Sequence, residues 1–147
     1  MSVSRPAPAD CLFCRIIGGE VDAEVVLETE EMVGFLDHRP LFKGHTLLVP
    51  RRHVVTLSDL PAELRGPFVE AGQRLSTAMV VGLGAQGSFV ALNNIVSQSV
   101  AHLHMHVVPR TKGDGLRGFF WPRSRYASGE AGEYAVRLRA ALADEAP

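Results

Sequence analysis

Three of the six histidines of the chain stand at alternate positions in the stretch AHLHMHVVPR. His102, His104 and His106 are separated by Leu103 and Met105. Successive side chains of a β-strand point to opposite faces, so this spacing predicts three imidazoles on one face and apolar side chains on the other. Neighbours on such a face are about 6.6 Å apart. An imidazole titrates near neutral pH and can be nucleophile, acid or metal ligand, so the row indicates a site of chemistry.

This row of histidines has two other interpretations. An exposed polar strand face is the plain alternative, but strict period-two spacing with apolar spacers disfavours it. A zinc site made of all three histidines is the second. On one straight strand the outer two lie about 13 Å apart, whereas Zn–N bonds are about 2.0–2.1 Å long. One strand therefore cannot place all three on one metal, although one or two can join ligands from elsewhere.

The only two cysteines, Cys11 and Cys14, form a C-x-x-C motif. The N-terminal sequence MSVSRPAPAD has no hydrophobic signal core, which predicts a cytoplasmic protein. In such a reducing compartment this spacing favours metal binding or redox chemistry over a structural disulfide.

The elements expected to hold these residues form an α+β fold with a mostly antiparallel sheet of about five strands and one long helix. A helical turn is predicted at 11–17, and the long helix is expected to start at 58–61 and to extend to about residue 82. An alanine-rich helix is predicted at 129–143. The predicted strands are 25–28, 32–37, 45–50, 88–94 and 103–110.

Length and composition bound the function. A chain of 147 residues is most simply one domain. Its net charge of −1 disfavours nucleic acid as a partner. The sequence has no apolar run long enough to predict a membrane-spanning helix. We expect a frayed tail over residues 1–10, a domain over 11–115, and a C-terminal extension over 116–147.

The sequence HLHMHVV, which begins at His102, fits the His-φ-His-φ-His-φ-φ signature, where φ is apolar, and so resembles the histidine-triad (HIT) superfamily of nucleotide hydrolases and transferases. Two further stretches are similar to the opening and central segments of its bacterial members, namely CLFCRIIGGEVDAEVVLE and VGFLDHRPLFKGHTLLVPRRHV. The resemblance spans about residues 11–115. It implies a five-stranded sheet with a long helix, paired into a ten-stranded sheet in a homodimer.

The resemblance also implies a reaction. The central histidine, His104, would attack the α-phosphorus of a purine nucleotide or dinucleotide, with its second nitrogen held by the carbonyl of His102. His106 would contact phosphate oxygens or the leaving group, and Gln98 and Ser99 would bind phosphoryl oxygens. His45 matches a further histidine that supports the triad.

The nucleoside site follows from the same resemblance. Asp37 would accept the ribose hydroxyls, and Asn93 would lie close to the α-phosphate. His38 stands where the family usually has an apolar residue, which changes the expected base contacts. The loop at 93–100 is shorter than in relatives and has no glycine, so we expect a differently shaped phosphate site. The predicted base pocket is lined by Phe13, Ile16, Phe35 and Leu47.

Some members of the superfamily, notably bacterial ones, carry a structural zinc at positions that match Cys11, Cys14, His53 and His102. Two thiolates and two imidazoles are a common tetrahedral zinc set. The metal would attach the N-terminal segment to the catalytic strand. If no zinc binds, His102 is a free member of the triad that orients its neighbours.

The segment at 109–125 has five basic residues against one acidic residue and includes three adjacent aromatics. Such a segment would steer a phosphate-rich leaving group to the site or would pack on a dimer partner. Overall the sequence predicts a nucleotide hydrolase, either a nucleoside phosphoramidase or a dinucleoside polyphosphate hydrolase. A non-catalytic nucleotide-binding module and a nucleotidyltransferase to phosphate are the alternatives.

Overall fold

A computed structural model of the protein describes residues 8–116 and 123–144. The chain forms two compact units that divide between Asp114 and Gly115. Within the described part, the first unit is a five-stranded antiparallel sheet with a long helix, which confirms the predicted fold class. Of the predicted N-terminal tail, residues 1–7 lie outside the described residues, and residues 8–10 are exposed.

The sheet has the strand order β1-β2-β3-β5-β4, and every neighbouring pair is antiparallel. The predicted strands are confirmed to within one or two residues at most ends. The strand order places β5 between β3 and β4, so that His106 is flanked by Leu47 and Ala91. The strands are β1 (Val25–Glu28), β2 (Met32–Leu36), β3 (Thr46–Pro50), β4 (Gly87–Leu92) and β5 (Met105–Arg110).

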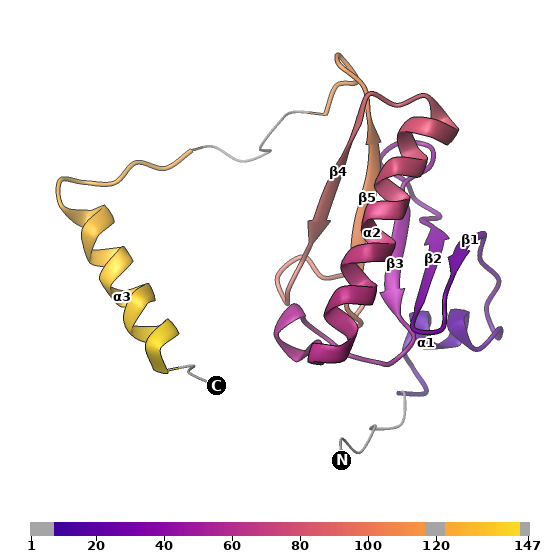
Figure 1. Ribbon diagram of the computed structural model, residues 1–147, viewed down its shortest axis with the longest axis horizontal. Coiled ribbons are helices and arrows are strands. Elements are labelled where there is room, and N and C mark those ends of the chain that lie inside the picture. The colour runs from indigo at the N-terminus through magenta and orange to yellow at the C-terminus, as the bar shows by residue number, and fades with distance from the viewer. Residues whose placement is uncertain (1–7, 117–122, 145–147) are drawn as a thin grey trace. The chain divides into compact units, whose positions relative to one another are not determined.

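Both faces of the sheet bury apolar side chains, because residues along β2 and β3 alternate between two cores. Met32 and Leu48 belong to the core beneath the long helix α2 (Ala62–Leu83), which lies across one face of the sheet (Figure 1). Val33 and Leu47 belong to a second core, which also holds residues of the short helix α1 (Leu12–Ile17). The site described below lies on the face with α1.

Helix α2 buries one side against the sheet. Near its end Met79 is buried, whereas Ala78 and Gly82 are exposed. Pro61 directly precedes the helix. The helix continues unbroken past Pro67. The buried residues are Leu64, Phe68, Ala71, Gly72, Leu75 and Met79.

The second unit contains the helix α3 (Glu130–Asp144), which was predicted at 129–143. Near its start the rings of Tyr126 and Tyr134 lie 6.0 Å apart, and the Arg137 guanidinium lies over the Tyr134 ring. The three adjacent aromatics of the basic segment, at 119–121, lie outside the described residues. Over the ranges that the structure describes, no helix is both long and apolar enough to span a bilayer.

Candidate active site and metal centre

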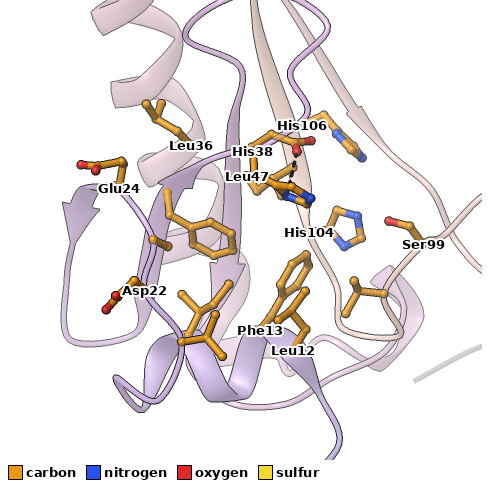
Figure 2. A pocket seen from close by; sticks show the side chains of 16 residues that line it. Leu12, Phe13, Asp22, Glu24, Leu36, His38, Leu47, Ser99, His104 and His106 are labelled. Atoms are coloured by element: carbon orange, nitrogen blue, oxygen red, sulfur yellow. Dashed lines mark ion pairs between the residues drawn. The ribbon is translucent and has the colours of Figure 1, made fainter.

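A cavity of about 640 Å³ opens between α1, the end of β2 and the segment before β5, and we call it the nucleotide cavity (Figure 2). Most residues predicted to form the nucleotide site lie on its wall. These are the four predicted base-pocket residues and five polar ones, namely Phe13, Ile16, Phe35, Leu47, Asp37, His38, Ser99, His104 and His106.

The triad histidines point away from the apolar residues between them, as their spacing predicts. Leu103, Met105 and Val107 all lie in the core beneath α2. The strand itself begins only at Met105, two residues later than expected, so His102 and His104 lie in the extended segment that leads into it. Both are buried, and they do not form an exposed strand face.

The imidazole of His104 has a fixed tautomer. Its Nδ1 lies 2.7 Å from the carbonyl oxygen of His102. A carbonyl only accepts, so Nδ1 carries the proton and donates it. In the neutral ring Nε2 therefore keeps its lone pair. The predicted acceptor for this nitrogen is confirmed, and the geometry leaves one nucleophilic nitrogen on a residue that lines the cavity.

The tautomer of His106 is set by a chain of hydrogen bonds behind the cavity. The backbone N–H of Leu41 donates to Nδ1 of His45 at 3.1 Å. Neutral His45 must then carry its proton on Nε2, which lies 2.9 Å from Nδ1 of His106. His106 accepts this bond, so its own proton sits on Nε2. His45 does not line the cavity, and it acts on the site through His106.

Three imidazoles of this site, those of His45, His104 and His106, are held neutral by burial. Burial, together with the neighbouring His104 and His45, lowers the pKa of His106 to about 4. Burial likewise lowers the pKa of His104 and of His45, with Asp37 acting in the opposite direction. Neutral rings are required both for a nucleophilic Nε2 on His104 and for the hydrogen-bond chain through His45.

Asp37 follows β2 and lines the nucleotide cavity. Its Oδ1 accepts the backbone N–H of Arg39 at 2.9 Å, and Nδ1 of His38 lies 3.8 Å away. Its Oδ2 is 3.8 Å from Nε2 of His45. The ion pair between Asp37 and His38 is drawn in Figure 2. The His38 side chain is 83% exposed, so it borders the cavity at its rim.

Gln98 and Asn93 do not line the nucleotide cavity, in contrast to their predicted roles at the phosphate. The Gln98 amide donates to the carbonyl of Val55 at 2.6 Å, and its oxygen accepts the N–H of Ile95 at 2.9 Å. Both ends of the amide therefore hold the loop. The glycine-free loop reaches its shape by placing Ile95 and Ser97 at positive φ, a conformation that costs an L-residue about 1–2 kcal/mol.

Arg110, the first basic residue of the segment at 109–125, does not lie beside the site, contrary to expectation. This residue ends β5, so about 20 Å of strand separates it from His104. Its guanidinium forms a two-bond pair with Asp114, at 2.6 and 3.1 Å. The pairing stabilises the turn after β5 and gives no support to a phosphate-binding role for Arg110.

The four residues predicted to bind metal converge on one point. The ligand atoms of Cys11, Cys14, His53 and His102 all lie within 4.8 Å of one another. Nε2 of His102 donates to the carbonyl of Pro50 at 2.8 Å, which leaves the lone pair of Nδ1 facing the group. That nitrogen is 3.4 Å from Sγ of Cys11 and 3.5 Å from Sγ of Cys14. Such a set of inward-facing thiols and imidazoles can hold a metal ion.

A second group, Asp37, His45 and His106, also has its polar atoms close together. It does not suit a metal. The Leu41 N–H points at Nδ1 of His45, so the proton must be on Nε2, the atom that would have to bind the ion. These residues form a hydrogen-bonded chain instead.

Sequence reasoning missed the end of the nucleotide cavity farthest from the triad. The loop between α1 and β1 and the last residue of β2 complete that wall, and two of its residues are acidic (Figure 2). No periodicity or motif marks these residues, because they reach the cavity only through the path of the loop. They are Val21, Asp22, Ala23, Glu24 and Leu36.

A five-stranded antiparallel sheet whose triad histidines His104 and His106 line a cavity is the arrangement expected of the HIT superfamily, and sequence comparison assigns the same family. The chain matches the HIT domain family over residues 18–113 and belongs to that family. A HIT-like protein of Methanocaldococcus jannaschii is 39% identical over 107 residues, which are 71% of this chain and 82% of that protein.

Two further relatives bear on chemistry. The adenosine 5′-monophosphoramidase of Saccharomyces cerevisiae is 32% identical over 147 residues, covering 95% of this chain and 89% of that protein. A zinc-bound histidine triad family protein of Mycobacterium smegmatis superposes with a TM-score of 0.70 at 38% identity, covering 90% of this chain and 97% of that one. At the level of the family, these similarities support hydrolysis of nucleotides and a site that can hold metal.

Proposed function

We propose that this protein is a nucleotide hydrolase that cleaves nucleoside 5′-phosphoramidates through a covalent nucleotide on His104. The observation that carries the proposal is the 2.7 Å hydrogen bond from Nδ1 of His104 to the carbonyl of His102. It fixes the lone pair on Nε2 of a residue that lines the nucleotide cavity. An imidazole in this tautomer attacks phosphorus without first losing a proton.

The lining of the cavity suits a nucleoside monophosphate unit. The base would lie among Phe13, Ile16 and Phe35, and the ribose hydroxyls would donate to Oδ2 of Asp37. This placement brings the α-phosphate to His104. Ser99 lies on the same side of the cavity as His104 in Figure 2, and its hydroxyl would donate to a phosphoryl oxygen. Nε2–H of His106 is the second donor.

The reaction proceeds in two displacements. In the first, Nε2 of His104 forms a bond to phosphorus, the bond from phosphorus to the leaving nitrogen breaks, and that nitrogen keeps the electron pair and takes up a proton. In the second, water attacks phosphorus, the bond to Nε2 breaks, and the water loses one proton to solvent, which balances the proton that the amine took up. The lone pair returns to His104, and the His102 carbonyl stabilises the positive charge that the intermediate carries on this ring.

The charges around the cavity favour a phosphoramidate over a dinucleoside polyphosphate. Among the described residues, the nucleotide cavity is lined by three carboxylates, Asp22, Glu24 and Asp37, and by no lysine or arginine. Burial lowers the pKa of its His104 and His106, which keeps both rings neutral. A polyphosphate chain would enter without a cationic partner, whereas a phosphoramidate has one negative charge and releases an amine. The similarity to the yeast phosphoramidase supports the same choice.

Replacement of His104 tests this function. His104→Asn and His104→Ala should each lower the hydrolysis of adenosine 5′-phosphoramidate by about 10⁴-fold, because the nucleophile is lost. The readout is release of adenosine monophosphate, and intact-mass analysis of rapidly quenched wild-type protein should show one added nucleotide. Near-wild-type turnover by either variant contradicts the mechanism. Binding without turnover or a trapped adduct would favour a non-catalytic module, and nucleoside diphosphate formed with added phosphate would favour a transferase.

The same reasoning leads us to propose a structural zinc at Cys11, Cys14, His53 and His102. Tetrahedral bonds of about 2.0–2.1 Å to nitrogen and 2.3 Å to sulfur require edges of about 3.3 Å between nitrogens and 3.5 Å between nitrogen and sulfur. The two Nδ1 atoms are 3.2 Å apart, and Cys14 Sγ is 3.4 Å from His53 Nδ1. When bound, the metal closes this cluster and supplies no open position for chemistry.

Metal analysis tests the zinc proposal. We expect one equivalent of zinc per chain after purification without a histidine tag, and Cys14→Ala should abolish it. Removal of zinc should lower the free energy of unfolding by about 4 kcal/mol where free zinc exceeds its Kd a thousandfold. Ser58→Ala, an exposed hydroxyl outside the cluster, is a control that should retain the metal. Less than a tenth of an equivalent, with stability unchanged by chelator, would exclude the site.

A further inference from the structure

A second cavity of about 500 Å³ adjoins the nucleotide cavity, and we call it the side cavity. The two share Leu12, Ser99 and Val100 as a common wall. No step described so far uses the side cavity. Its remaining walls are the segment before α1, the segment after β3 and the residue that precedes the triad, namely Pro8, Asp10, Cys11, His53, Val55 and Ala101.

Ser99 connects this second cavity to the reaction. This residue lines both cavities, so a phosphoryl group held between Ser99 and His104 has the side cavity as its neighbour. Displacement at phosphorus places the leaving group roughly in line with the attacking atom and on the opposite side. A leaving group that departs from His104 past Ser99 therefore enters the side cavity, while the nucleoside remains in the nucleotide cavity.

The lining of the side cavity selects the chemistry of that group. Five of its residues, Pro8, Leu12, Val55, Val100 and Ala101, present apolar side chains. Asp10 is its one carboxylate, and no lysine or arginine borders it within residues 8–116. An apolar surface with one negative charge attracts a carbon chain that ends in a cation and repels one that ends in an anion.

We propose that the side cavity binds the leaving amine of the substrate and that Asp10 selects amines with an apolar body and a distal positive charge. This inference rests on the proposed function, and it specifies the substrate class as nucleoside phosphoramidates of cationic alkyl amines. The bond that breaks is the same P–N bond. The distal cation takes no part in the proton balance of the reaction.

Asp10 has a second neighbour that any test must take into account. Its negative charge acts on the imidazole of His53, where it opposes the lowering of the pKa by burial. A carboxylate beside a metal-binding histidine commonly orients that ring. Zinc content and thermal stability are therefore measured for every Asp10 variant, so that a change in leaving-group preference can be separated from damage to the metal centre.

The test uses four adenosine 5′-phosphoramidates that differ only in the amine. The amines are ammonia, pentylamine, 1,5-diaminopentane and 5-aminopentanoate. We expect kcat/KM to rank the diamine above pentylamine and pentylamine above the aminopentanoate, by about three- to fivefold per step, which is the effect of one partly exposed charge pair. High salt should compress the differences, because it screens such charges. The ammonia compound needs no side cavity and reports the basal reaction.

Variants at position 10 assign the preference. Asp10→Asn should bring the diamine and the aminopentanoate to within about twofold of pentylamine, and Asp10→Lys should invert their order. Glu28→Gln is the matched control, because it removes an exposed carboxylate from β1 that lines neither cavity. It should leave the wild-type ranking intact.

The outcomes separate this inference from the proposed function. Two results overturn the inference: equal kcat/KM for the three alkyl phosphoramidates in wild type, or a wild-type ranking that survives in Asp10→Asn with zinc retained. In either case, hydrolysis of the ammonia compound still supports the function. Failure to hydrolyse any of the four compounds overturns the function and this inference with it. Inversion of the order in Asp10→Lys supports both.

Discussion

The proposed reactivity of His104 depends on a proton that the fold places on its other nitrogen. The carbonyl of His102 accepts a hydrogen bond from that nitrogen. The peptide N–H of Leu41 fixes the tautomer of His45, which in turn fixes the tautomer of His106. Both tautomers are fixed by backbone groups, whose donor or acceptor character does not change with pH. The site thus presents a lone pair on one ring and an N–H donor on the next.

The pH dependence of activity follows from these buried rings. Burial lowers the pKa of both His104 and His106 below the ordinary imidazole value of 6.5, to about 4 for His106. We expect kcat/KM to stay level as the pH falls through 6.5 and to decline only in more acidic solution. Steady-state rates with adenosine 5′-phosphoramidate between about pH 4 and pH 8 measure this. An acidic limb centred at or above 6.5 contradicts the expectation.

Folding should depend on the same protons. The unfolded chain binds a proton at His106 near pH 6.5, whereas the folded chain resists it down to about 4. The unfolded state therefore binds more protons in this window, and stability should fall as the pH drops from 6.5 toward 4. Urea midpoints across the window measure the slope. His106→Asn should reduce the slope, and part of it should remain because burial also lowers the pKa of His102, His104 and His45. An unchanged slope in that variant would remove His106 as a cause.

At the scale of elements, the contact between α2 and β5 holds the triad segment in place. Gly72 lies on the buried side of α2, and a Cβ built on it would stand 2.7 Å from Sδ and 3.2 Å from Cε of Met105. Met105 is the residue between His104 and His106. The absence of a side chain at position 72 lets the helix lie directly on the start of β5, next to the triad segment.

Gly72→Ala should therefore destabilise the protein by about 1–3 kcal/mol, since the added methyl crowds Met105 in a packed core. Gly66→Ala is the matched control in the same helix, because a Cβ there meets nothing within 4 Å. It should stabilise by roughly 0.5–1 kcal/mol through helix propensity alone. Chemical denaturation of the two variants measures the difference in the free energy of unfolding. Equal effects would show that the Met105 side chain moves aside to admit the methyl group.

At the scale of the whole molecule, the first unit has two sheet edges, β1 and β4. A strand at an edge has unpaired backbone groups that can join a second sheet. The predicted homodimer with a ten-stranded sheet must therefore use one of these edges, and it remains a prediction. Sedimentation should give the mass of two chains, and hydrogen exchange should show protected amides on one edge strand. A monomer with rapidly exchanging edges would exclude the dimer.

The division of the chain between Asp114 and Gly115 lies close to the predicted boundary between 115 and 116. The domain assignment itself stays a prediction, and a chain ending at residue 114 tests it. Such a chain should keep the sheet, α2 and zinc, because the described residues that line the metal cluster and both cavities all precede that point.

The sequence alone determined the parts of this protein that depend on local spacing. Alternation put Leu103, Met105 and Val107 in one core and the triad on the other side, and turn residues bounded the strands. Tertiary structure decided the rest, because it depends on which distant segments meet. Only the fold bonds the Gln98 amide to Val55, gives His45 its place behind His106, and sets a second cavity beside Ser99. Periodicity specifies the face on which a side chain lies, whereas its partner across that face is set by strand order and loop path.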